Sequence, residues 1–140
     1  MPHASMSQPS SQAVVSEGLR KWFVLHFVAD LVFAVPLLVA PRAFLGALGW
    51  TCVDPISARL VGAALAAIGI ESVLVRGEGP RVFRAMLTLK VIWSACATVG
   101  ILASQLQGGP ALGWAFLVVF AVFNVVWTYY LRGLRAPAGP

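Results

Sequence analysis

The sequence predicts an all-α integral membrane protein, a four-helix bundle whose spans run up and down in antiparallel order. Three observations support this prediction. The 140 residues are 59% hydrophobic and only 11% charged, which is too apolar for a soluble domain of this size. The apolar residues gather into runs about as long as a helix that crosses a bilayer. Glycine and proline lie between these runs, where they favour turns over helix.

These runs define one transmembrane domain and two tails. A Ser-, Gln- and Pro-rich tail at residues 1–20 is expected to be disordered and cytoplasmic, and a second cytoplasmic tail is expected at 132–140. The transmembrane domain occupies residues 21–131. Its spans are expected at about 22–40, 56–75, 82–104 and 111–131. Apolar residues at helical spacing within 41–55 indicate a short helix at the membrane interface.

The positions of the basic residues predict the orientation. Lysine and arginine are enriched in the cytoplasmic loops of membrane proteins. In this chain only Arg42 and Arg59 fall on the side of the first and third loops, and Lys90 lies inside a span. The other basic residues share the opposite side: Arg20, Lys21, Arg76, Arg81, Arg84, Arg132 and Arg135. We therefore expect a multi-pass protein of the cell inner membrane with both termini in the cytoplasm.

Polar residues within the spans predict one cluster. An unpaired lysine in hydrocarbon is costly, so Lys90 needs a partner or a wet cavity. Counting about 1.5 Å per residue from the cytoplasmic helix ends places the polar residues of every span in the same half of the bilayer. Asp30 comes to the depth of Lys90, which favours a buried ion pair between the first and third spans. The resulting candidate ligand or proton site consists of His26, Asp30, Glu71, Lys90 and Asn124.

The charge of this predicted cluster makes it sensitive to pH. Two carboxylates facing one lysine leave one negative charge without a partner. A protonated His26, a proton on Glu71 or a bound cation would balance it.

Small residues on the second span predict close helix packing. Gly62, Ala66 and Gly69 form one stripe, and small residues at such spacing let two helices approach closely.

Motifs for catalysis, metal binding and cofactor binding are absent. The sequence contains no CxxC, no HExxH, no phosphate-binding glycine loop and no nucleophile elbow, so no catalytic residue, metal or cofactor is assigned. The net charge of +5 would suit nucleic acid, but the basic residues sit at span ends rather than in a polar and aromatic cluster. The expected partners are therefore the lipid bilayer, a lipophilic small molecule, and a second copy or another membrane protein.

The segment RLVGAALAAIGIES, from Arg59 to Ser72, places an arginine at the start of a small-residue helix. With the spacing of the spans, it resembles the small four-span bacterial membrane proteins grouped as DoxX-like. That resemblance implies a four-helix bundle inserted by several passes, and it carries no catalytic residue over to this chain.

Three functions remain open from the sequence. The first is a small module that binds a lipophilic ligand or is linked to proton movement at the polar cluster. The second is an accessory or scaffold subunit, in which the cluster only fixes helix pairing and the small face of the second span docks a partner. The third is a membrane isomerase that uses a glutamate and a histidine as acid and base.

Overall fold

The computed structural model describes residues 15–134, and within that range the chain is helical and contains no strand. Residues 1–14 and 135–140 of the predicted tails lie outside the described residues. The first helix begins earlier than the sequence suggested, because residues 17–20 of the expected tail are helical. The elements are α1 (Glu17–Val39), α2 (Pro41–Ala47), α3 (Pro55–Leu74), the 3-10 turn η1 (Val75–Gly77), α4 (Pro80–Leu106) and α5 (Leu112–Gly133).

Four of the helices in residues 15–134 are long and apolar enough to cross a membrane: α1, α3 together with η1, α4 and α5. This confirms the prediction of four helices of spanning length. The short helix expected in the first loop is also present as α2.

Local sequence signals explain where two of these helices begin. The Ser16 side chain accepts a hydrogen bond from the backbone N–H of Leu19 at 3.2 Å and so caps α1. The Asp54 carboxylate accepts from the N–H groups of Ile56 and Ser57, each at 3.1 Å, and caps α3.

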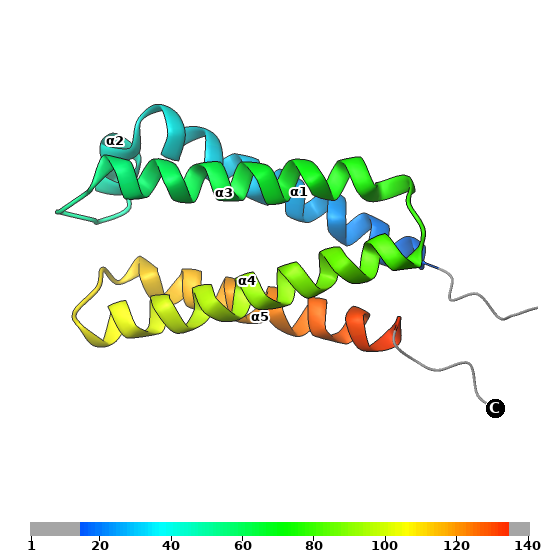
Figure 1. Cartoon of the computed structure of the whole chain (residues 1–140). Helices are drawn as coiled ribbons and strands as arrows, with labels where there is room; N and C mark the ends of the chain where they lie inside the picture. Colours follow the sequence, from blue (N-terminus) through cyan, green and yellow to red (C-terminus); the bar gives the residue numbers. More distant parts are fainter. Residues whose placement is uncertain (1–14, 135–140) are drawn as a thin grey trace, which may run out of the picture.

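The long helices form two pairs, in which α1 packs against α3 and α4 packs against α5 (Figure 1). The start of α1, the connection from α3 to α4 and the end of α5 lie at one end of the molecule, and α2 and the turn between α4 and α5 lie at the other (Figure 1). We call these the α1/α3 pair and the α4/α5 pair.

The small-residue stripe of α3 lies inside the α1/α3 pair. A Cβ added at Gly62 would lie 3.0 Å from the Cβ of Leu37 on α1. Gly62 and Gly69 are buried and Ala66 is half-buried. The stripe therefore faces α1 within the same chain, which leaves the buried glycines unavailable as a docking face for a partner.

Within residues 15–134, the buried apolar side chains form two clusters. One surrounds Phe23 near the start of α1, Phe83 near the start of α4 and Trp127 toward the end of α5. The other contains Ala34 of α1 and Leu65 of α3. On α1 the first cluster ends at Phe23 and the second begins at Ala34, so the intervening turns lie between two apolar layers.

Large apolar side chains also cover the outside of the long helices. Val32 of α1 is 61% exposed, Leu60 of α3 is 67% exposed and Val125 of α5 is 68% exposed. Continuous apolar exposure of this kind marks contact with a membrane or with other proteins rather than with water.

Candidate functional site

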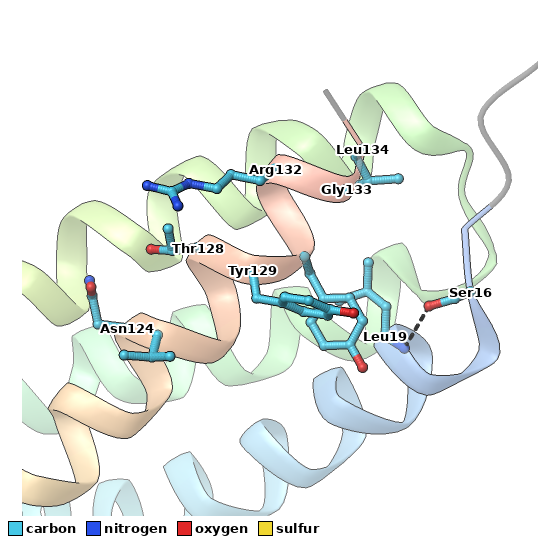
Figure 2. A pocket seen from close by; sticks show the side chains of 10 residues that line it. Ser16, Leu19, Asn124, Thr128, Tyr129, Arg132, Gly133 and Leu134 are labelled. Carbon is cyan, nitrogen blue, oxygen red and sulfur yellow. Dashed lines mark hydrogen bonds between the residues drawn. The ribbon is translucent and has the colours of Figure 1, made fainter. Parts of the chain in front are cut away.

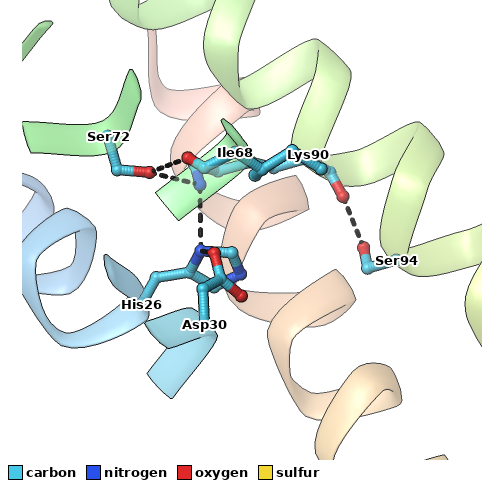
Figure 3. Close-up of polar contacts among 6 residues, drawn as sticks. All are labelled: His26, Asp30, Ile68, Ser72, Lys90 and Ser94. Carbon is cyan, nitrogen blue, oxygen red and sulfur yellow. Dashed lines mark hydrogen bonds and ion pairs between the residues drawn. The ribbon is translucent and has the colours of Figure 1, made fainter. Parts of the chain in front are cut away.

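Lys90 reaches from the α4/α5 pair into the α1/α3 pair. Its side chain is buried, with the residue 1% exposed. The amine Nζ donates a hydrogen bond to Ser72 Oγ of α3 at 2.8 Å and lies 3.0 Å from His26 Nδ1 of α1 (Figure 3). One side chain of α4 thus contacts both helices of the opposite pair. We call His26, Asp30, Ser72 and Lys90 the polar centre.

Ser72 presents a fixed acceptor to Lys90. Its hydroxyl donates to the backbone carbonyl of Ile68 at 2.6 Å, so that a lone pair of Oγ is left to accept from the amine (Figure 3). The residue is completely buried. Ser72 was not predicted from the sequence, because a serine in a helix commonly bonds its own backbone and is no signal of a site. Its position three residues after Gly69, on the face that packs against α1, was the available clue.

His26 and Asp30 lie one turn apart on α1 and face each other. The distance between His26 Nδ1 and Asp30 Oδ2 is 2.9 Å, and both residues are 6% exposed. The same ring nitrogen therefore lies within hydrogen-bonding distance of a carboxylate oxygen and of the Lys90 amine. Glycine at position 69 provides space for the carboxylate, because a Cβ there would lie 3.2 Å from Asp30 Oδ2.

The direct ion pair expected between Asp30 and Lys90 does not form in residues 15–134. The ion-pair prediction was wrong because depth along the helices was matched without the direction of each side chain. The Lys90 amine turns to Ser72 and His26, and His26 Nδ1 is the atom that contacts both charged groups.

Aromatic rings enclose the polar centre. The Lys90 amine lies 5.1 Å from the ring centroid of Phe23 and 5.3 Å from that of Trp127. His26 packs edge-on against Phe123, with ring centroids 4.9 Å apart. The two ring faces attract a cation and so offset part of the cost of burying the amine. The buried Nε1 of Trp127 has no hydrogen-bond partner in the described part of the chain.

Asn124 lies beside the polar centre and connects to it through the backbone. Its side-chain Nδ2 donates to the Val91 carbonyl at 2.9 Å and to Ser94 Oγ at 3.0 Å. The Ser94 hydroxyl in turn donates to the Lys90 carbonyl at 2.7 Å (Figure 3). Asn124 therefore joins α5 to α4. Its connection to Lys90 runs through Ser94 to the backbone carbonyl of Lys90 and not to the amine.

Glu71 lies outside the polar centre, contrary to its place in the predicted cluster. Its side chain is exposed, while the adjacent Ser72 is buried. Neighbouring residues on a helix point about 100° apart, and this rotation separates the two side chains. Without Glu71, the formal charges of Asp30 and Lys90 balance, so the polar centre holds no uncompensated negative charge of the kind that the sequence predicted.

A groove of about 770 Å³ runs along the final turns of α5 (Figure 2). Asn124 and Arg132 of α5 line it, Arg132 toward the end of the helix, and Ser16 and Leu19 of α1 also line it (Figure 2).

The described residues contain no group of three or more His, Cys, Asp and Glu side chains that could hold a metal ion. The arrangement instead suits proton chemistry, because an imidazole, a carboxylate and an amine meet at hydrogen-bonding distance in a buried setting. Comparison of the chain with protein-family models, with curated proteins and with solved structures finds no match.

Proposed function

We propose that the chain is a multi-pass inner-membrane protein whose polar centre binds and releases a proton, and that this proton controls the contact between the two helix pairs. Its four long helices cross the bilayer in antiparallel order, with both termini in the cytoplasm. The resemblance to DoxX-like proteins stays a prediction, and the proposal takes no residue role from it.

The observation that supports the proposal is the crowding at one atom. His26 Nδ1 lies 2.9 Å from Asp30 Oδ2 and 3.0 Å from Lys90 Nζ. A ring nitrogen carries either a proton or a lone pair, so it donates one hydrogen bond or accepts one. With a proton on Nδ1, His26 donates to Asp30 and cannot accept from Lys90. Without that proton, His26 accepts from Lys90 and leaves Asp30 Oδ2 without a donor.

One proton therefore changes which contact is satisfied. The contact between His26 and Asp30 stays within α1, whereas the contact between His26 and Lys90 joins the two helix pairs. Because an unsatisfied buried polar group costs about 1–3 kcal/mol, the exchange is large enough to shift a conformational equilibrium. Protonation at this nitrogen would weaken the link from α4 to α1 and leave Lys90 bonded to Ser72.

The structure gives less support to the other two functions. A scaffold that docks partners on Gly62 and Gly69 conflicts with the burial of both glycines against α1. An isomerase that pairs Glu71 with His26 conflicts with the exposure of Glu71 and the burial of His26. A lipophilic ligand at the polar centre stays a prediction.

The proton position can be observed directly by ¹⁵N NMR of histidine in lipid bilayers. The chain has two histidines, so His3→Gln leaves His26 as the single labelled ring. We expect its nitrogen shifts to report a change of protonation across about pH 5 to 8, the range in which histidine commonly titrates. Lys90→Met should alter this titration, and Glu71→Gln, which removes an exposed acid, should leave it unchanged. A His26 ring that keeps one protonation state over the whole range would contradict the proposal.

The two native cysteines test the conformational step. Cys52 precedes α3 and Cys96 lies on α4, and both are free and exposed. Spin labels on them report the distance between the two helix pairs without engineered sites. We expect the distance distribution to depend on pH in the wild type and to lose that dependence in Lys90→Met. An identical distribution at both ends of the pH range would show that the centre is structural only.

A further inference from the structure

A second groove, separate from the polar centre, lies beside the start of α1 and the turn η1, which follows α3. It has a volume of about 370 Å³. Three cationic side chains, one acidic side chain and one apolar side chain line it: Arg20, Lys21, Arg76, Glu17 and Val24. Positive charge therefore exceeds negative charge in this groove.

Arg20 is held in place at one side of the groove. Its Nη2 donates to the backbone carbonyl of Glu78 at 3.3 Å, and its guanidinium lies 5.1 Å from the ring centroid of Phe83. Such a guanidinium loses little conformational freedom when it binds an anion, because its position is already fixed. Arg76 of η1 also lines the groove and is exposed.

The apolar side of the groove continues into the exposed surface of α1. Val24 lines the groove, and Val28, one turn further along α1, is 51% exposed. A ligand that fits both parts has an anionic head and an apolar tail. Glu17 lies 3.0 Å from the Lys21 amine, and its negative charge repels an anion in the groove. A lipid also gains apolar contacts with α1, which a small free anion does not.

We propose that this groove binds the phosphate headgroup of one anionic phospholipid, whose acyl chain lies along α1 at Val24 and Val28. This inference rests on the membrane insertion in the proposed function and is independent of its proton step. Arginine pairs well with phosphate oxygens, and basic residues next to a span attract the anionic lipids of the cytoplasmic leaflet.

Native mass spectrometry of the full chain, released from micelles doped with phosphatidylglycerol or phosphatidylcholine, counts the bound lipids. We expect one phosphatidylglycerol to be retained in preference to phosphatidylcholine. The double variant Lys21→Gln with Arg76→Gln should lower the association constant for phosphatidylglycerol about thirtyfold. This corresponds to a loss of about 1 kcal/mol of binding free energy for each of the two basic groups. Arg20 is left intact since it also holds Glu78.

Arg132→Gln is the matched control, because Arg132 is an exposed arginine in the last turn of α5 and does not line this groove. It should retain the lipid as the wild type does. Glu17→Gln should act in the opposite direction and raise retention, which keeps the test informative even if the double variant folds poorly.

Three results would overturn the proposal. The first is equal retention of the two lipids by the wild type, and the second is unchanged retention of phosphatidylglycerol by the double variant. The third is displacement of phosphatidylglycerol by inorganic phosphate at an equal concentration, which would assign the groove to a soluble anion. The His26 titration should be the same in the double variant and in the wild type. A failure of the lipid site is thereby distinguished from a failure of the proton site.

Discussion

Gly69 of α3 lies against Asp30 of α1 so closely that a Cβ added to the glycine would be 2.9 Å from the Asp30 Cβ. No side chain fits at that distance without a shift of one helix. Asp30 is also the carboxylate that faces His26. The packing of the α1/α3 pair and the geometry of the polar centre therefore depend on the same glycine.

Gly69→Ala should consequently damage both the stability and the centre. We expect the free energy of unfolding to fall by about 1–3 kcal/mol, as is typical when a methyl group is forced into a packed interface. The measurement is the unfolding midpoint in detergent, together with the ¹⁵N signals of His26. Gly100→Ala is the control, because nothing lies within 4 Å of a Cβ added at Gly100 of α4. Equal midpoints for the two variants would show that the close approach at Gly69 is not limiting.

A double-mutant cycle at Lys90 and Ser72 should reveal strong coupling between α4 and α3. Ser72→Ala leaves the Lys90 amine without its acceptor at 2.8 Å, and we expect a loss of about 1–3 kcal/mol in the free energy of unfolding. Once Lys90 is replaced by Met, the same serine change should cost far less. The coupling free energy should therefore lie within about 0.5–3 kcal/mol. Additive losses in the cycle would mean that the amine does not depend on Ser72.

Asn124→Leu should weaken the α4/α5 pair while sparing the proton chemistry. The change removes both hydrogen bonds from Asn124 Nδ2 to α4, and hydrogen bonds between membrane helices are worth on the order of 1 kcal/mol. Unfolding in detergent measures the loss. Thr98→Val is a suitable control, because the Thr98 hydroxyl donates only to the Ser94 carbonyl on its own helix. If the His26 titration also shifts in Asn124→Leu, the residue is more than a link between two helices.

The sequence predicted the helices well, because hydropathy and glycine and proline positions are local signals. The four helices of spanning length and the short helix α2 follow from such signals within the described chain. Counting along each helix also placed Asp30 and Lys90 at the same depth and put His26 in the same half of the bilayer, and the structure brings these three together.

Counting residues along a helix does not predict how that helix is rotated about its own axis, and so does not predict which side chains face the neighbouring helix. Glu71 and Ser72 differ by one residue in depth, yet one is exposed and the other is completely buried beside Lys90. The choice between them depends on which face of α3 packs against α1, and hydropathy says little about that when a helix is apolar on every side. The same limitation explains why His26 was not recognised as the group that contacts both Asp30 and Lys90.

Low pH should loosen the start of α3 by protonating Asp54, the capping residue just before this helix. Hydrogen bonds from the Ser57 side chain, and then from the backbone N–H groups of Ser57 and Ile56, hold the pKa of the Asp54 carboxyl below its ordinary value of 3.8. The pKa of Asp54 is therefore lower in the folded chain than in the unfolded chain. The ionised cap stabilises the fold at pH values above the pKa of the unfolded chain, and this contribution is lost as the pH falls through the pKa of the folded chain. Below about pH 4 we therefore expect faster amide hydrogen exchange at Ile56 and Ser57, relative to the rates intrinsic to each pH. Asp54→Asn retains an oxygen acceptor for the cap but cannot titrate, so its exchange should lack this acid dependence. The same acid dependence in the wild type and in Asp54→Asn would locate the loosening at another group.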